Sequence, residues 1–239
     1  MAKKLAYSII EQKDSERVTC IQFHQSYSYE DFIEGYKPTE DGGFVLKRGI
    51  FYNVCTKAKS DPNKDYFLII DEINRGNLSK IFGELLMLIE EDKRDDESLK
   101  LAYSEKDFTV PSNLHIIGMM NTADRSLALM DFALRRRFVF YDVKPAFNNP
   151  NFINYQKSLN NEYFDTIIEK IKKLNDDIKD DLDEGFEIGH SYFSNLENPT
   201  KEELDAIIKY QIMPTLEEYW FDNKEKYNYW KKEFGVDNE

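Results

Sequence analysis

Two adjacent carboxylates, Asp71 and Glu72, directly follow the apolar run F-L-I-I at residues 67–70. A short, continuously apolar run is typical of a strand buried on both faces of a parallel sheet. Side chains at the carboxyl end of such a strand project into the crevice where ligands bind. An Asp there can hold Mg²⁺, and the next carboxylate can activate a water for phosphoryl transfer. The alternative is a pair of acids that caps the following helix.

A second apolar run, L-H-I-I-G-M-M at residues 114–120, ends at Asn121. A neutral amide at a strand tip can hold a γ-phosphate or a water without adding negative charge. The alternative is a turn or a helix cap, where Asn is favoured. Polar groups at two strand tips of one chain strengthen the functional interpretation of both.

Three consecutive arginines, Arg135, Arg136 and Arg137, close a predicted helix over residues 124–137, where cations suit the helix C-terminus. One interpretation is a solvated helix end. The functional interpretation is an arginine finger, which stabilises charge on a phosphoryl group bound by a neighbouring subunit. A finger of this kind requires an oligomer.

The apolar pattern also predicts the elements that position these groups. Strands are expected at 18–23, 66–70, 114–120 and 138–143, with a hairpin arm at 43–49. Helices are expected at 50–58, 78–89 (with Asn77 as N-cap), 124–137, 164–178 and 202–219. Strands that alternate with helices predict a mostly parallel α/β sheet, and the loss of the strand signal after residue 146 predicts a smaller helical domain.

Composition narrows the class of protein. The formal charge of -13, from 32 Lys plus Arg against 45 Asp plus Glu, argues against a broad basic face for polyanions. Two cysteines, Cys20 and Cys55, fit no disulfide framework and suggest a reducing compartment. The histidines lack metal-ligand spacing, and no apolar run approaches the roughly 20 residues that span a bilayer. We therefore expect a cytoplasmic protein without a membrane partner.

One part of a nucleotide site is absent from this sequence. None of the ten glycines is followed by lysine, so the chain contains no glycine-rich phosphate loop ending in Gly-Lys-Ser or Gly-Lys-Thr. Such a loop supplies most of the phosphate contacts in P-loop enzymes.

Four stretches together resemble the McrB family. They are F-H-Q-S-Y-S-Y-E-D-F-I-E-G-Y-K-P (23–38), I-I-D-E-I-N-R-G-N-L-S-K-I-F-G-E (69–84), M-N-T-A-D-R-S-L-A-L-M-D-F-A-L-R-R-R-F (120–138) and G-H-S-Y-F (189–193). The resemblance covers nearly the whole chain. It implies a P-loop NTPase of the AAA+ fold over residues 1–145, without its first strand and phosphate loop, and a small α-helical lid domain over 146–239.

The resemblance also implies a function. McrB proteins are GTP-hydrolysing motors that form rings, typically hexamers, and bind a nuclease subunit, McrC. The complex cleaves DNA that carries 5-methylcytosine, which full-length members recognise with a separate N-terminal domain. GTP preference rests on the family alone: N-T-A-D (121–124) lacks the lysine of the guanine-reading motif N-K-x-D.

The family's motifs assign roles at the Walker B strand and the following strand. By resemblance, Asp71 binds Mg²⁺ and Glu72 activates water. Asn74 helps to position that water or transmits the partner's stimulation. Asn121 is the sensor 1 residue.

The remaining roles lie in the second half of the chain. Asp124 and Arg125 complete the family's signature motif at the nucleotide. Arg136 and Arg137 are the trans-acting arginines. His190 and Ser191 match a lid motif near the nucleotide.

In the family the phosphate loop lies just before the helix that A-K-K-L-A-Y-S-I-I (2–10) resembles. We therefore expect Met1 to be an internal methionine of a longer protein, and we expect this polypeptide to be inactive alone. Two other functions stay open. The chain is a non-catalytic AAA+ module that joins McrB or McrC rings, or it is an AAA+ ATPase of the related MoxR type.

Overall fold

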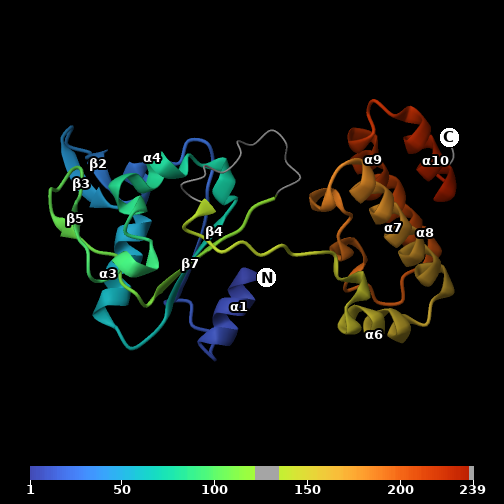
Figure 1. Ribbon diagram of the computed structural model, residues 1–239, viewed down its shortest axis with the longest axis horizontal. Helices are drawn as coiled ribbons and strands as arrows, with labels where there is room; N and C mark the ends of the chain where they lie inside the picture. The colour runs from blue at the N-terminus through green and yellow to red at the C-terminus, as the bar shows by residue number, and fades with distance from the viewer. Residues whose placement is uncertain (122–134, 237–239) are drawn as a thin grey trace. The chain divides into compact units, whose positions relative to one another are not determined.

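The computed structural model describes residues 1–121 and 135–236. They belong to two compact units, Met1–Phe140 and Tyr141–Glu239 (Figure 1). The first unit is α/β and the second is helical, so the predicted fold class is confirmed. The domain boundary that we expect after residue 145 stays a prediction.

A parallel sheet forms the centre of the first unit. Its described strands are β1 (Val18–Gln22), β4 (Tyr66–Asp71) and β7 (Leu114–Gly118), in the order β1-β4-β7. Residues 66–70 of β4 are all buried, as the apolar run predicts for a central strand. The register aligns Gln22 with Asp71 and Ile70 with Gly118, so the carboxyl ends of the strands meet.

The side chains of β4 alternate between the two faces of the sheet. Leu68 and Ile70 join one buried cluster, which includes Phe51 and Cys55 of α3 (Ile50–Ser60). Phe67 and Ile69 join another on the opposite face with α1 (Ala2–Ile9). Because each buried Leu, Ile or Phe contributes about 1.5–3 kcal/mol, this two-sided burial holds β4 in place.

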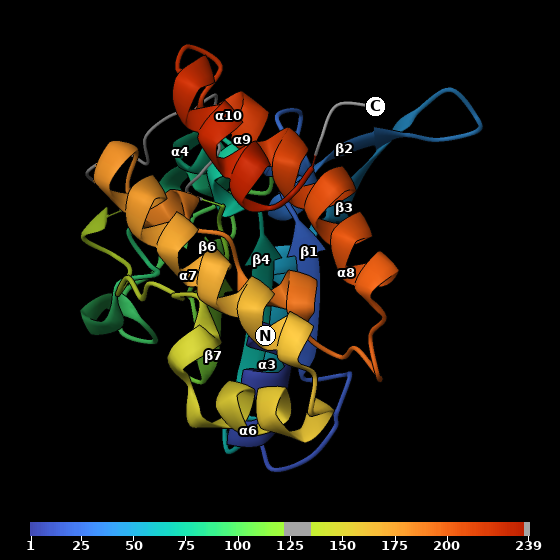
Figure 2. The ribbon, with the colours of Figure 1, turned by 90° about the vertical axis from the view of Figure 1, so that its right-hand side faces the viewer.

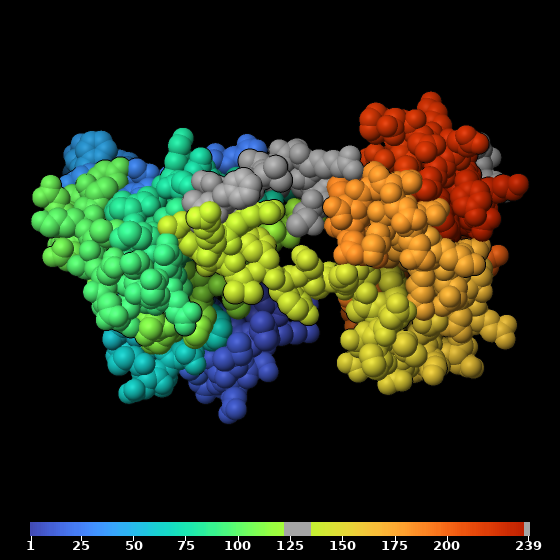
Figure 3. Space-filling model, viewed as in Figure 1, coloured from blue at the N-terminus to red at the C-terminus, as the bar shows by residue number. Residues whose placement is uncertain are grey.

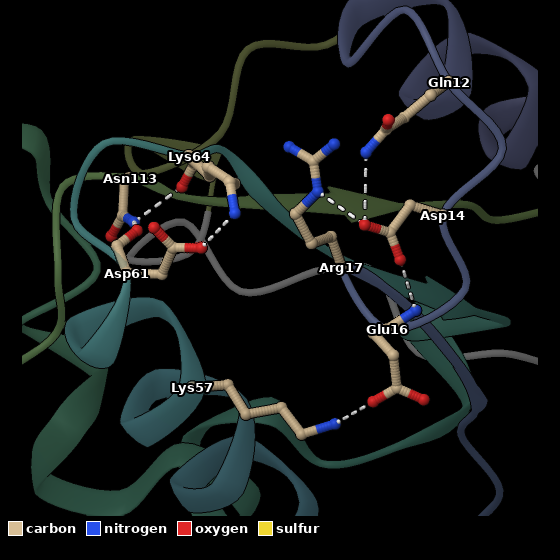
Figure 4. Close-up of polar contacts among 8 residues, drawn as sticks. All are labelled: Gln12, Asp14, Glu16, Arg17, Lys57, Asp61, Lys64 and Asn113. Carbon is tan, nitrogen blue, oxygen red and sulfur yellow. Dashed lines mark hydrogen bonds and ion pairs between the residues drawn. The ribbon is translucent and has the colours of Figure 1, made fainter.

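Polar contacts tie the amino end of the sheet to α3 (Figure 4). The Asn113 side chain lies just before β7, and its Nδ2 donates hydrogen bonds to three carbonyls: those of Ala58 at 3.0 Å, Asp61 at 3.1 Å and Lys64 at 2.7 Å. Lys57 of α3 forms an ion pair of 2.9 Å with Glu16, which precedes β1. These contacts fix the loop through which the chain enters β4.

A β-hairpin separates β1 from α3, as the sequence predicts. The short helix α2 (Tyr29–Phe32) leads into β2 (Glu34–Pro38), which pairs antiparallel with β3 (Phe44–Arg48). A smaller hairpin, β5 (Leu99–Lys100) and β6 (Asp107–Phe108), follows later in the chain. In Figure 2 the β2–β3 hairpin extends away from β1 and β4.

The expected continuous helix over 78–89 is wrong. The observed helix α4 (Leu78–Phe82) ends at Gly83, whose φ of 52° is left-handed, and a 3-10 turn, η2 (Gly83–Leu86), follows. A Cβ at Gly83 would meet the Tyr29 ring at 3.0 Å. The apolar residues that suggested a helix are nevertheless buried, except Leu86, which is partly buried, so periodicity identified the packed side chains but not the break at glycine.

The strand expected at residues 138–143 is also wrong, because this segment is in no strand. Val139 is 99% and Tyr141 is 85% exposed, and Figure 3 shows the segment on the surface. A β-prone sequence forms a strand only beside a hydrogen-bonding neighbour, and no described strand lies on the side of β7 away from β4. Most of the helix expected at 124–137 lies outside the described residues.

The second unit is a stack of helices. Its helices are α6 (Pro150–Leu159), α7 (Glu162–Asp181), α8 (Lys201–Ile207), α9 (Met213–Tyr219) and α10 (Lys224–Glu233). The helix expected at 202–219 corresponds to α8 and α9, joined through a π-helical turn at Ile208–Ile212. Buried Asn175 of α7 bonds both backbone groups of Ile188, with Nδ2 donating at 3.0 Å and Oδ1 accepting at 2.7 Å. Across residues 1–121 and 135–236, no helix has the length and apolar character to cross a membrane.

Candidate functional site

The carboxyl ends of the three parallel strands form the floor of the candidate site. Phe23 N–H donates to the Asp71 carbonyl at 2.9 Å, and Met119 N–H donates to the Ile70 carbonyl at 2.8 Å. Asp71 is exposed at this edge. A cavity of ≈ 340 Å³ opens beside it, lined by Met1, Ala2, Lys3, Cys20, Ile21, Gln22, Ile69, Asp71 and Met119.

Glu72 occupies a strained position directly after β4. Its φ of 51° and ψ of 43° lie in the left-handed region, which costs a non-glycine residue of order 1–3 kcal/mol. The Glu72 N–H donates to Asp71 Oδ1 at 3.1 Å. Glu72 Oε2 lies 3.1 Å from Arg75 Nε in an ion pair, although the two atoms do not meet the geometry of a hydrogen bond. The two neighbouring carboxylates therefore have different partners, the Glu72 N–H for Asp71 and Arg75 for Glu72.

Asn74 lies in the 3-10 turn η1 (Ile73–Arg75), which packs against the neighbouring strand. Ile73 N–H donates to the Met119 carbonyl at 3.0 Å, and a Cβ on Gly118 would lie 2.7 Å from Ile73 Cδ1. Asn74 Oδ1 is buried without a hydrogen-bond partner among the described residues. A buried acceptor left unpaired costs about 1–3 kcal/mol, which is consistent with the predicted role in positioning a water. That role stays a prediction.

The predicted sensor, Asn121, follows β7 and is exposed. Because β7 pairs directly with β4, the structure brings Asn121 to the same edge of the sheet as Asp71 and Glu72. Asp124 and Arg125, the predicted signature residues, lie outside the described residues.

The three arginines have different surroundings. Arg137 Nη2 forms an ion pair of 2.6 Å with Glu90, and this arginine is 20% exposed at the side chain. The Arg135 guanidinium lies 5.9 Å from the centre of the Phe140 ring, a cation–π contact. Arg136 is exposed. Arg137 is thus engaged within its own chain, whereas Arg136 is presented to the surface as a trans-acting arginine requires.

His190 and Ser191 lie in the second unit, in the 3-10 turn η6 (His190–Phe193). His190 Nδ1 accepts a hydrogen bond of 3.1 Å from Ala146 N–H, so this nitrogen carries no proton. The ring also packs edge-on against Phe147 and Phe152, at 6.3 Å and 6.1 Å. These contacts hold His190 in one tautomer and orientation within its unit, and Ser191 is exposed beside it.

The fit to a magnesium ion rests on Asp71. Within the described part of the chain, no three His, Cys, Asp or Glu side chains are grouped to hold a metal. Mg²⁺ in nucleotide sites is held by one or two carboxylates together with substrate phosphates and water, so an exposed Asp71 beside a cavity fits that arrangement. The metal would polarise the phosphates of a bound nucleotide.

Sequence reasoning missed two residues of the site. One is Arg75, which pairs with Glu72; the i, i+3 spacing of an arginine to an acid signals such a contact. The other is Cys20, which lines the cavity beside Asp71. Its place on the strand that pairs with β4 follows from the register and could not be read from the sequence.

Comparisons with known proteins give two family matches. Residues 1–138 match the model of the AAA domain (dynein-related subfamily), and residues 166–228 match the model of the McrB α-helical lid domain. The resemblance to McrB is confirmed by a relative, the Type IV methyl-directed restriction enzyme EcoKMcrB subunit of Escherichia coli (strain K12). It is 50% identical over 96% of this chain and 53% of its own length.

A second relative is more distant. The Type II restriction enzyme BsuMI component YdiS of Bacillus subtilis (strain 168) is 29% identical over 48% of this chain and 37% of its own length. The chain therefore spans about half, or less, of these relatives.

Proposed function

We propose, from the premise that this chain belongs to the AAA domain family (dynein-related subfamily) and has a McrB-type lid, that it is the nucleotide-hydrolysing motor part of a modification-dependent DNA restriction system. GTP is the preferred nucleotide and Mg²⁺ the metal. The observation that carries the proposal is the carboxylate pair Asp71–Glu72 at the end of a buried parallel strand, with Asn121 after the next strand. The similarity to the E. coli restriction subunit supports the restriction role.

Each residue has a chemical task in this proposal. Asp71 holds Mg²⁺, and Glu72 accepts a proton from the attacking water. Asn74 orients that water through its buried Oδ1, while Asn121 senses the γ-phosphate. Arg136 of a neighbouring copy stabilises the developing negative charge, which requires assembly into a ring.

The remaining assignments concern partners. A McrC-type nuclease subunit uses the motor, and recognition of DNA with 5-methylcytosine belongs to a domain or partner other than residues 1–239. The protein acts in the cytoplasm. Asp124, Arg125, His190 and Ser191 contact or surround the nucleotide, and Arg137 acts in trans with Arg136.

The proposal also states what these 239 residues do alone. Without a phosphate loop, the polypeptide neither binds nor hydrolyses GTP or ATP appreciably. Isothermal titration and phosphate release with both nucleotides test this. Micromolar GTP binding by the isolated chain would show that the loop is dispensable.

A second experiment tests the catalytic assignment. Adding the strand and phosphate loop to the N-terminus is expected to produce Mg²⁺-dependent GTP hydrolysis. Glu72→Gln should then remove that hydrolysis and leave GTP binding intact, whereas Glu91→Gln, at an exposed acid in the turn η3 (Glu91–Lys93), serves as the matched control. Full activity in Glu72→Gln would remove Glu72 from the mechanism.

The lack of a phosphate loop also favours a second candidate, a non-catalytic module that joins McrB or McrC rings. In that case the extended chain would assemble with such rings yet hydrolyse no nucleotide. A MoxR-type ATPase would instead prefer ATP in the same assay.

A further inference from the structure

The β2–β3 hairpin projects from the first unit (Figure 2). It carries exposed apolar side chains. Tyr36, Phe44 and Val45 are 53%, 73% and 42% exposed. The base is fixed, because buried Glu34 accepts a hydrogen bond of 2.7 Å from Ser104 N–H through Oε1. At the other side of the base, a Cβ on Gly49 would lie 2.3 Å from the Phe32 carbonyl carbon. Exposed apolar groups on a fixed element mark an interaction site.

The hydrogen-bond pattern shows which backbone groups face outward. Thr39 N–H donates to the Gly43 carbonyl at 2.9 Å, and Gly49 N–H donates to the Ile33 carbonyl at 2.7 Å. These two bonds continue the register of the β2–β3 ladder, in which hydrogen-bonded and non-bonded residue pairs alternate. The backbone groups of residues 35, 37, 45 and 47 therefore form hydrogen bonds within the hairpin. Because the pattern alternates, the N–H and C=O groups of residues 34, 36, 38, 44, 46 and 48 face away from it.

The two edges of the hairpin differ. On the β2 edge, Pro38 has no N–H to donate to a further strand. The Tyr36 ring packs against the Tyr103 ring at 5.8 Å on the face that Tyr36 shares with Leu46. On the β3 edge, the backbone N–H and C=O groups of Phe44 and Leu46 bond no other residue within 1–121 and 135–236. The β3 edge is thus open to a further strand.

The side chains along β3 define what such a strand would carry. Phe44 and Leu46 lie on one face of the hairpin with Tyr36, and Val45 and Lys47 lie on the other. Lys37, on the second face, already forms an ion pair of 2.7 Å with Asp31, so exposed Lys47 is the cation that β3 offers to an added strand on that face.

We propose that β3 accepts an extended segment of a partner protein as a third strand, and that this segment alternates apolar and acidic residues. The backbone of this segment forms hydrogen bonds with the backbone of Phe44 and Leu46. Its apolar side chains pack on the face of Tyr36 and Leu46, and its acidic side chains form ion pairs with Lys47. A second copy of this chain brings Lys47 and Arg48 to the same edge and offers no acid there. Nucleic acid would meet Glu40 and Asp41 at the hairpin tip.

The test uses the full chain and a fluorescein-labelled octapeptide of alternating Val and Glu. Fluorescence anisotropy is expected to show binding at least about tenfold tighter than that of a Val–Lys octapeptide, since the charge at Lys47 selects the partner. Leu46→Pro removes an outward N–H without removing a ladder bond, so it should weaken binding at least about tenfold. Leu46→Ala keeps the N–H and is its control.

A charge variant provides a second test that does not depend on the proline. Lys47→Glu should weaken binding of the Val–Glu peptide about fivefold or more and strengthen binding of the Val–Lys peptide, whereas Lys13→Glu, at an exposed lysine outside the hairpin, should change neither. Hydrogen exchange should slow at Phe44 and Leu46 on peptide binding, while Val45 and Lys47, already bonded, change less.

Three outcomes would overturn the proposal. They are equal binding of the two peptides, unchanged binding by Leu46→Pro, and protection elsewhere than on β3. Self-association that Leu46→Pro abolishes would assign the edge to a second copy instead. Binding of a labelled DNA duplex that depends on Lys47 but not on Leu46 would assign it to nucleic acid.

Discussion

The first unit joins residues that are far apart along the chain, whereas the second is built from successive helices. In the first, β1 pairs with β4 about fifty residues later, and β4 pairs with β7 across a similar interval. In the second, α7 to α10 follow one another, and side chains of Asn161, Thr200 and Asn223 cap three of the helices. The helix ends of the second unit are therefore specified by local caps, while the sheet of the first depends on long-range strand pairing.

Charge separates the two units further. Residues 1–140 contain 20 Lys plus Arg against 23 Asp plus Glu, whereas residues 141–239 contain 12 against 22. Most of the excess negative charge thus lies in the helical unit. The folded helical unit must therefore withstand more repulsion between its own negative charges than the α/β unit does. The α/β unit must instead keep the strands of its sheet paired.

The largest expected losses of stability come from truncating a buried side chain in the core of each unit. Phe164→Ala in α7 should destabilise the second unit by about 3–5 kcal/mol, and Leu68→Ala in β4 should destabilise the first by about 2–5 kcal/mol, because both side chains are 0% exposed. The two tryptophans, Trp220 and Trp230, lie in the second unit, so their fluorescence in urea reports that unit. Labelling of buried Cys55 reports the first.

If the units unfold separately, Phe164→Ala shifts the tryptophan transition and Leu68→Ala shifts only the labelling of Cys55. A Leu68→Ala variant that moves both transitions equally would show that the two units unfold as one. Exposed Cys20 provides the control for intrinsic thiol reactivity.

A close backbone approach in the α/β unit gives the next largest effect. Gly118→Ala places a Cβ 2.7 Å from Ile73 and should cost about 1–3 kcal/mol through overpacking. In the helical unit, Gly189→Ala meets nothing closer than Ser191 Oγ at 3.6 Å and should leave stability nearly unchanged. The same two probes measure both variants. Equal effects would mean that the sheet absorbs the added methyl.

Removal of a helix cap should have a smaller effect. Thr200 accepts from Glu203 N–H at 3.2 Å, and Glu203 Oε2 accepts from Thr200 N–H at 2.8 Å, which forms a capping box. Thr200→Ala should cost about 1 kcal/mol in the tryptophan transition. Thr166→Ala, inside α7, is the control because its hydroxyl bonds only the Glu162 carbonyl of its own helix. No shift for Thr200→Ala would show that local capping contributes little to this unit.

Acid sensitivity should show the smallest effect. Lys179 and Lys144 bond the Glu184 carboxylate and lower its pKa from 4.5 to about 2. Because the pKa is lower in the folded state, this contribution to stability is present above pH 4.5 and is lost as the pH falls towards 2. Glu184→Gln should therefore lose less stability than the wild type across that window.

The measurement is the urea midpoint of tryptophan fluorescence between pH 5 and 2. Since the ion pairs are exposed, the difference between wild type and Glu184→Gln should shrink in about 1 M salt, where charges are screened within about 3 Å. A difference that salt does not change would argue against the ion pairs as its cause.

The sequence predicted β4 and the start of α4, which carry or adjoin the candidate site, better than the segments at residues 83–89 and 138–143. The run F-L-I-I-D-E predicted Asp71 at the end of a buried strand, because a strand of continuous apolar residues is buried on both faces of the sheet. Asn77 also caps α4 as expected, with its side chain accepting from Lys80 N–H. The roles of these residues in hydrolysis stay predictions.

The errors arose where long-range context decides the local structure. Residues 138–143 have strand-forming side chains, but a strand needs a neighbour, and sequence pattern does not report which edges are paired. Gly83 interrupts a helical pattern through a backbone conformation that periodicity ignores. The left-handed backbone of Glu72 is likewise not anticipated by helix or strand propensity, although the i, i+3 spacing of Glu72 and Arg75 is compatible with their ion pair.

At Glu72, the left-handed backbone conformation lowers stability, while the proposed hydrolysis needs the carboxylate of this residue. A glycine would adopt φ 51° without steric cost, so Glu72→Gly should relieve backbone strain, although it also removes the partner of Arg75. Glycine, however, carries no carboxylate. A screen of random variants for heat resistance would therefore favour the loss of this side chain, and a screen for hydrolysis would reject it. The residue recovered at position 72 would thus show whether a selection acted on stability or on hydrolysis.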